Sequence, residues 1–335
     1  MRVLVIAGVL AGSVTLAAQW PKLTDSAVPR DARGGVRYDA PTPRRADGKP
    51  DLSGMWMRAN SGPPRGGGRG GRQGEGGGQA GRGGGQPAPL PAGQIPGGAN
   101  SNAEAAGGGP PAGGAGGGVS LEPATTAFTF DPSGPPVATF FEAGGNMEGG
   151  LPYTPWAAQI RKERLALNAR DNPDAMCMPM GFLQFHQQPQ PRRIYHMDKI
   201  ILIEYEANYG LRKIYLDRTL PPQGDVNPTW YGYSVGRWEG DDLVVETNNL
   251  RGAEDGPYDG WHDVNGSPYS NGAKFTERFR RKSVGQLQVD FTQDDPKAYT
   301  KPWTVRVDFR VFPDEEIIEF VCNENQQFRR KIKID

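Results

Sequence analysis

This chain has almost no cysteine, no net charge and no long apolar run beyond its first residues. Its 38 Lys plus Arg residues balance 38 Asp plus Glu residues, so the formal net charge is zero. A neutral chain gives no electrostatic reason to expect a polyanionic partner such as nucleic acid. The mean hydropathy of -0.62 agrees with the lack of a second apolar span. We therefore predict no transmembrane segment and no nucleic-acid partner.

Cysteine is the scarcest informative residue. The chain has two cysteines, Cys177 and Cys322, and they lack the Cys-x-x-Cys spacing of a redox pair. In an oxidising compartment an isolated pair is most simply a disulfide. We predict a structural disulfide that ties the segment before the β-rich region to its last strand.

The N-terminus has the layout of a secretory signal. Met1 and Arg2 precede an apolar run from Val3 to Ala18, and small residues precede Gln19. The run is too short and too rich in alanine and glycine for a membrane span. We predict that residues 1–18 are a signal peptide and that the mature protein is periplasmic or secreted.

Composition divides the rest of the chain. Residues 19–50 are polar and unpatterned and predict an extended N-terminal arm, and residues 51–60 contain a first strand around Trp56. Residues 61–120 are dominated by Gly, Pro, Gln and Ala, which bury too little apolar area to offset their ordering entropy. They predict a disordered linker before a β-barrel-like domain at residues 121–335.

The second half of the chain repeats one pattern, in which apolar and polar residues alternate over short runs between turn signals. This period of two places alternate side chains on opposite faces of a sheet. It predicts strands at 193–197, 200–206, 211–217, 230–238, 242–248, 274–282, 285–293, 303–312 and 316–322. With the strand at Trp56 they favour closure, because a closed sheet has no exposed edges. The predicted fold is mainly β: an antiparallel meander that closes into a lipocalin-like barrel, with one short helix.

That helix is predicted from Pro155 to about Ala169. Thr154 is a candidate N-cap, and proline suits the first helical turn. A loose apolar face is formed by Trp156, Ile160, Leu165 and Leu167. Two further segments, Thr125–Phe130 and Val137–Phe141, could be strands.

Strand alternation places one carboxylate inside the predicted barrel. Glu277 shares a face with Phe275 and Phe279, and apolar faces of the next two strands would line the same interior. A carboxylate there needs a partner, and the candidates are Arg281 on the same face or a barrel tyrosine.

Aromatic residues gather at Trp230, Tyr231, Tyr233 and Trp238. Such rings are either ordinary barrel packing or the lining of a binding cavity. We predict a small-molecule ligand, no cofactor, and ligand contacts from Trp230, Tyr231, Tyr233, His262 and Glu277.

Sequences that resemble catalytic or metal sites lack their proper context. Gly232–Gly236 matches Gly-x-Ser-x-Gly, but a hydrolase elbow needs a strand, a turn and then a helix, whereas a hairpin follows here. The loop from Glu254 to Asn271 is rich in carboxylates and places His262 beside Asp263, yet its spacing matches no calcium loop, and a solvated loop is predicted. A zinc site would need all three histidines to converge, so no metal is predicted.

Two resemblances arise from short motifs. Gly54-Met55-Trp56 on the first strand resembles the Gly-x-Trp opening of lipocalin-type (calycin) barrels. The segments Asp47–Gly54, Gly232–Thr247 and Asp295–Thr304 resemble a family of uncharacterised bacterial exported β-rich proteins, over most of the chain outside the Gly-rich tract. That family often shows Pro-His-Ser-Glu where this chain has Pro268-Tyr269-Ser270-Asn271, which puts any role of that His and Glu in doubt here. The resemblance implies no catalytic residue.

The leading hypothesis is an exported, non-catalytic protein that binds a small, partly apolar molecule in its β-barrel. One alternative is a barrel hydratase, isomerase or hydrolase that uses Glu277 with His262 or Tyr233. Another is a structural envelope component tethered by the Gly-rich segment.

Overall fold

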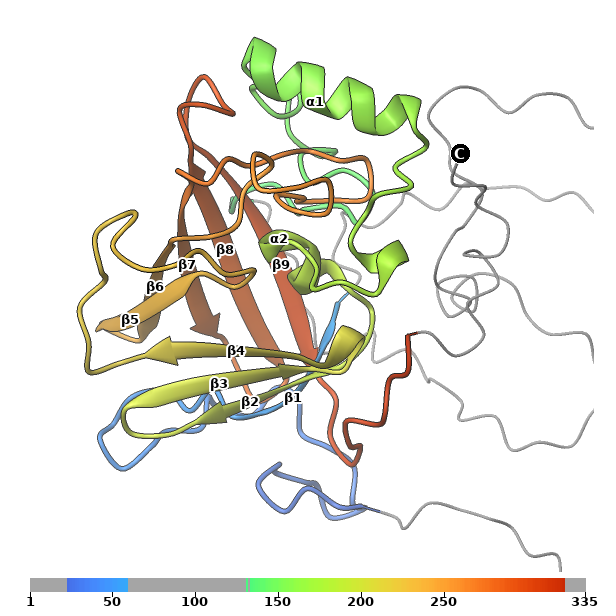
Figure 1. Ribbon diagram of the computed structural model, residues 1–335. Helices are drawn as coiled ribbons and strands as arrows, with labels where there is room; N and C mark the ends of the chain where they lie inside the picture. Colours follow the sequence, from blue (N-terminus) through green and yellow to red (C-terminus); the bar gives the residue numbers. More distant parts are fainter. Residues whose placement is uncertain (1–22, 60–130, 132, 323–335) are drawn as a thin grey trace, which may run out of the picture.

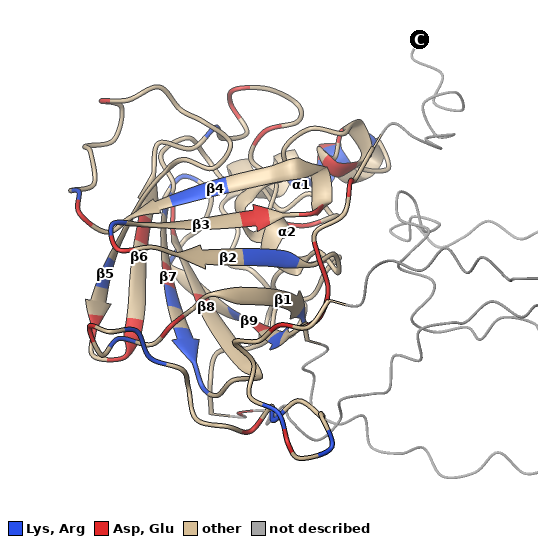
Figure 2. Ribbon diagram, turned by 90° about the horizontal axis from the view of Figure 1, so that it is seen from below, with Lys and Arg blue, Asp and Glu red and all other residues tan. Residues whose placement is uncertain are grey.

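The structure is a computed structural model that describes residues 23–59, 131 and 133–322. Nine strands form a closed barrel in which neighbours follow the order of the sequence (Figures 1 and 2). The mainly β fold is therefore confirmed. The strands are β1 (Gly54–Arg58), β2 (Arg192–His196), β3 (Ile200–Tyr205), β4 (Gly210–Tyr215), β5 (Tyr233–Glu239), β6 (Asp242–Asn248), β7 (Lys274–Arg281), β8 (Gln286–Asp294) and β9 (Trp303–Val311).

The barrel is closed by β1, which pairs with both β2 and β9 in antiparallel orientation. One pair departs from the predicted antiparallel meander. β4 and β5 are parallel, and only Ile214↔Ser234 and Tyr215↔Val235 are paired between them. A parallel pair needs a long return connection. Residues 216–232 provide it, and no tight turn follows β4.

The interior of the barrel follows the predicted alternation. Phe275 and Phe279 of β7 are buried, as are the inward positions of β8 and β9. The registers between β7, β8 and β9 place these side chains at facing positions. The inward apolar residues of the last two strands are Leu287, Val289, Phe291, Trp303, Val305, Val307, Phe309 and Val311.

The predicted helix is α1 (Pro155–Ala166), with the Thr154 side chain accepting a bond from the Ala157 backbone N–H. It lies outside the barrel, over one of its ends (Figure 1). The predicted apolar face is only half-buried: Trp156 packs against the core, whereas Leu167 is exposed. The buried residues of α1 are Ala157 and Arg164, and the Arg164 guanidinium lies 4.1 Å from the centre of the Trp261 ring.

A second helix was not predicted. α2 (Phe182–Gln187) lies at the barrel end near α1, and all six of its residues are buried (Figure 1). Arg192 stabilises its C-terminal end. The buried Arg192 guanidinium donates to the carbonyls of Phe185, His186, Gln188 and Gln190. At its N-terminal end Gly181 permits close packing, since a Cβ atom there would lie 1.5 Å from the Trp261 carbonyl oxygen. Two short 3₁₀ helices, η2 (Asp174–Met176) and η3 (Ala207–Tyr209), flank this region in the chain.

Two predicted strands are absent, and a third cannot be assessed. Residues 316–322 form no strand, because β9 already pairs with β8 and β1 and the closed barrel offers no edge for another strand. The segment Val137–Phe141 makes a single bridge, between Val137 and Arg306. Thr125–Phe130 lies outside the described residues, as do the whole predicted signal peptide and the whole predicted linker.

The described part of the N-terminal arm packs against the barrel. The Tyr38 and Ala40 carbonyls accept bonds from Gly285 and Val284, and the Thr42 hydroxyl donates to the Arg281 carbonyl. Isolated bridges Arg30↔Val36 and Arg44↔Pro50 fold the arm into two turns. The arm therefore covers the barrel end at which β7 finishes and β8 begins.

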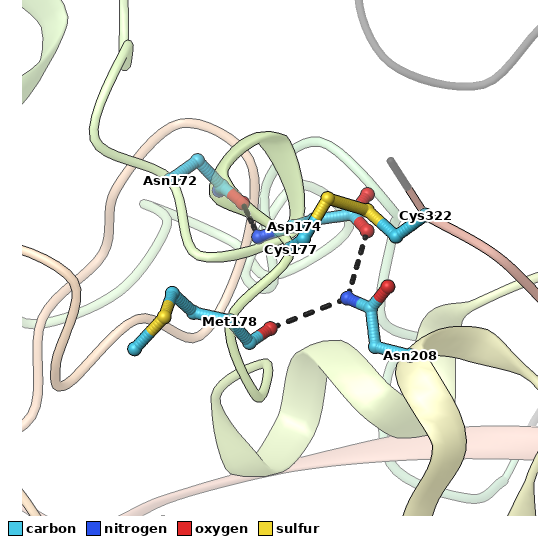
Figure 3. Close-up of a disulfide and its surroundings, with 6 residues drawn as sticks. All are labelled: Asn172, Asp174, Cys177, Met178, Asn208 and Cys322. Carbon is cyan, nitrogen blue, oxygen red and sulfur yellow. Dashed lines mark hydrogen bonds between the residues drawn. A yellow bond between two sulfur atoms is a disulfide. The ribbon is translucent and has the colours of Figure 1, made fainter. Parts of the chain in front are cut away.

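The predicted disulfide joins Cys177 and Cys322 (Figure 3). It ties the segment ahead of α2 to the segment after β9. A strand was predicted in this second segment, and that prediction is wrong. The Asn208 side-chain amide, nearby, donates to the Asp174 carboxylate and to the Met178 carbonyl (Figure 3).

Asp174→Asn is expected to stabilise the protein above pH 6. Burial raises the pKa of Asp174, and the hydrogen bond from Asn208 opposes this with a smaller effect, so that the pKa is about 6. Since the folded pKa lies above the unfolded value, ionising Asp174 costs stability progressively as pH rises from about 4 to about 6. We expect a gain of about 1–2 kcal/mol, discounted because the residue is only half-buried. Urea unfolding at pH 8 and pH 4 checks this, and an equal gain at both pH values would contradict it.

Candidate functional site

A cluster of charged side chains occupies the barrel interior. Glu277 is fully buried and accepts bonds from two residues: His186 Nε2 lies 2.7 Å from its Oε1, and the two terminal nitrogens of Arg212 lie 2.9 and 2.5 Å from its two oxygens. Arg212 also donates to the hydroxyls of Ser234 and Thr247. Glu277 thus points inward as predicted, but its partners are on α2 and β4.

The electrostatics of this cluster are those of a buried ion pair. Burial alone would raise the pKa of Glu277, but the charge of Arg212 and the bond from His186 overcome it and lower the pKa to about 2. Burial lowers the pKa of His186, against the opposing effect of Glu277. His186 is therefore neutral and donates its Nε2 proton to a carboxylate, which can only accept.

Aromatic side chains of α2 fill the space around these charges. The Phe182 ring lies 5.0 Å from the Phe275 ring, and the Arg212 guanidinium lies 4.2 Å from the Phe182 ring centre. The Phe185 ring lies 4.7 Å from the Tyr205 ring. α2 therefore fills this part of the barrel interior with its own side chains.

The aromatic segment ahead of β5 is divided between two environments. Tyr231 packs its ring 5.0 Å from that of Phe185, at the α2 end of the barrel. Tyr233 stacks 5.2 Å from Tyr215 and accepts a bond from Arg218, on the outer face. Its neighbour Ser234 faces inward, and successive strand residues point to opposite sides. Trp230 is half-buried under the Arg251 guanidinium.

His262 lies among rings. It is fully buried, with the rings of Tyr269, Trp303 and Phe275 within 5.7 Å of its own. Burial lowers its pKa to about 3, against the opposing effect of Gln293. A histidine with this pKa is a weak base at neutral pH.

The pairings proposed for catalysis are not formed. Tyr233 points away from Glu277, and the recorded side-chain partners of Glu277 are His186 and Arg212. Arg281, the other predicted partner, instead donates to the carbonyls of Asp51, Ser53 and Val284, because it lies at the barrel end where the arm crosses. Ser234 is an ordinary strand residue, bonded to Thr247.

The histidines and the acidic loop do not assemble a metal site. His186 and His262 lie in the two environments described above, and His196 stacks on Trp238 at 5.7 Å. Asp259 pairs with Arg251, and Asp263 accepts bonds from the Ser267 backbone and hydroxyl. Within residues 23–59, 131 and 133–322, no group of three or more His, Cys, Asp or Glu could hold a metal ion. In the same residues no helix is long and apolar enough to cross a membrane.

Two residues of the charge cluster were missed by the sequence reasoning. Arg212 shares a face of β4 with the buried Ile214, so strand parity alone could have indicated an inward-facing arginine. His186 lies on the short α2, whose sequence Phe-Leu-Gln-Phe-His-Gln has no cap residue and too few turns for a periodic pattern. No sequence signal placed it inside the barrel.

One pocket lies where the N-terminal arm meets the barrel. It has a volume of about 460 Å³ and forms where the arm (residues 23–28), β1, β2 and the segment after β9 meet. In Figure 1 the blue arm and the red segment after β9 both run beside β1 and β2. We call it the arm pocket. Its apolar lining comes from Leu23, Ala27, Val28, Pro43, Met55, Ile194, Val311 and Pro313.

The polar lining of the arm pocket contains more acidic than basic groups. Five acidic and two basic residues line it: Asp25, Asp51, Asp314, Glu315 and Glu316, with Arg193 and Arg281. Tyr195 supplies a partly exposed ring. A second pocket, of about 220 Å³, lies between α1 and the 253–261 loop. Glu277, His186, Trp230, Tyr231, Tyr233 and His262 line neither pocket.

Comparisons with models of protein families, with curated proteins and with solved structures found no match for this chain. The candidate site therefore rests on its own geometry.

Proposed function

We propose that this protein is a non-catalytic binding protein that takes a small, partly apolar molecule in the arm pocket. The observation that carries the proposal is the pocket itself. Its volume of about 460 Å³ falls within the range of small-molecule sites, roughly 300–1,000 Å³. Its lining combines apolar side chains with a few charged groups, as such sites do.

We place the ligand there because the interior of the barrel is already occupied. Phe182, Phe185 and His186 fill the space around Glu277, and the charges present have partners. We further propose that the protein works outside the cytoplasm, in the periplasm or secreted. The disulfide supports this location, because disulfides persist in oxidising compartments.

Binding of the neutral apolar dye Nile red tests the proposal. We expect saturable fluorescence enhancement with one site per chain, and its loss in Ala27→Trp, because Ala27 is an exposed residue that lines the pocket and a large ring there would fill it. Ala166→Trp is the matched control, since Ala166 is an exposed alanine on α1 outside the arm pocket. Thermal melts should show both variants folded. Dye binding that is absent, or unchanged by Ala27→Trp, would refute the proposal.

A further inference from the structure

We infer that the ligand of the arm pocket is a small organic cation, an apolar skeleton that carries one ammonium group. This inference rests on the proposed function and names the class of ligand. It is carried by the pocket's combination of apolar walls, unpaired carboxylates and one aromatic ring.

The carboxylates of the arm pocket differ in whether they already have partners within the protein. Asp314 is held by Arg30, whose terminal nitrogen lies 2.5 and 2.6 Å from its two oxygens. Asp51 accepts the Ser53 backbone N–H and lies 3.7 Å from His196 Nδ1. Among the described residues, Glu315 and Glu316 form no ion pair, and both are exposed at the pocket rim. These two carboxylates remain available to a ligand.

The two guanidinium groups of the lining are already engaged by the fold. Arg281 is held by backbone carbonyls of the arm and of the β7–β8 turn, and it lies 4.8 Å from the Trp56 ring centre. Arg193 donates to the Glu315 carbonyl. Neither arginine pairs with a carboxylate of the pocket at salt-bridge distance. Both therefore reduce the net negative charge of the pocket but leave Glu315 and Glu316 unpaired.

The aromatic ring suits the same ligand. Tyr195 lines the pocket, and its hydroxyl is fixed by a bond to Glu204 at 2.8 Å. A ring beside carboxylates favours an ammonium group, because the ring face and the carboxylates are both negative. Apolar walls from β1, β2 and β9 would hold the carbon skeleton.

Three probes that share one skeleton test the inference on the full chain: 4-phenylbutylamine, 4-phenylbutanol and 4-phenylbutyrate. Binding is measured by ligand-observed NMR at low salt and again at high salt. We expect the amine to bind about fivefold to tenfold more tightly than the alcohol, and the butyrate to bind most weakly. High salt should reduce the preference of the site for the amine.

Glu315→Gln/Glu316→Gln is expected to remove most of the amine's advantage and to leave alcohol binding unchanged. The matched control is Glu148→Gln/Glu319→Gln, which removes the same charge from exposed positions outside the pocket, one of them on the segment that follows β9. Equal binding of all three probes, or an equal loss in both double variants, would overturn the inference and leave the proposed function standing. Binding of none of the probes, together with no binding of Nile red, would overturn both.

Discussion

Glu277→Gln is expected to lower the free energy of unfolding by about 3–5 kcal/mol, because it leaves the Arg212 charge buried without its counter-ion. Both side chains are at most 2% exposed, so water cannot replace the lost partner. Urea unfolding at pH 7 measures the change. A role of Glu277 in turnover alone would leave the unfolding midpoint nearly intact, and that result would contradict the structural role assigned here.

A double-mutant cycle separates the interaction energy of the Arg212–Glu277 pair from the contributions of the two single residues. Arg212→Met/Glu277→Met removes both charges, so we expect it to be less destabilised than the sum of the two single variants. The pH dependence supplies a second check. The lowered pKa of Glu277 means that its stabilisation is present above about pH 4.5 and is lost as pH falls towards about 2. The deficit of Glu277→Gln should therefore shrink between pH 7 and pH 3.

The strands of the barrel were predictable where one face is buried. Along β7, β8 and β9 inward and outward residues differ strongly in polarity, so their alternation fixed both the strands and the direction of Glu277. The partner of Glu277 was not predictable in the same way. Arg281 shares its face, but the barrel end gives this arginine backbone carbonyls instead, whereas Arg212 meets Glu277 across the interior.

The features that close and fill the barrel arise from tertiary contacts. α2 is shorter than an isolated helix that is stable in water, and Arg192 holds its end by bonds to carbonyls. The parallel β4–β5 pair depends on the path of residues 216–232, which have no periodic pattern. The arm pocket combines residues about 290 positions apart, such as Asp25 and Asp314, whose proximity no local motif encodes.

Cys177→Ala/Cys322→Ala is expected to cost roughly 4–5 kcal/mol in the chain-entropy model. The disulfide spans 145 residues, so its removal lets the unfolded chain explore many more conformations. The denaturant slope should rise as well, because an unfolded chain without the cross-link exposes more surface. Urea unfolding of the variant and of the oxidised wild type measures both quantities.

Removing the disulfide should also destabilise the structure locally. Cys177 lies just ahead of α2, so hydrogen exchange over residues 178–188 is expected to accelerate more than exchange in β8 and β9. Wild-type protein under strong reductant is the chemical control and should match the variant. A stability loss below about 1 kcal/mol, well under the usual range for a native disulfide, would show that the bond does not restrain the unfolded chain. Uniform acceleration of exchange across the barrel would show that it acts only through global stability.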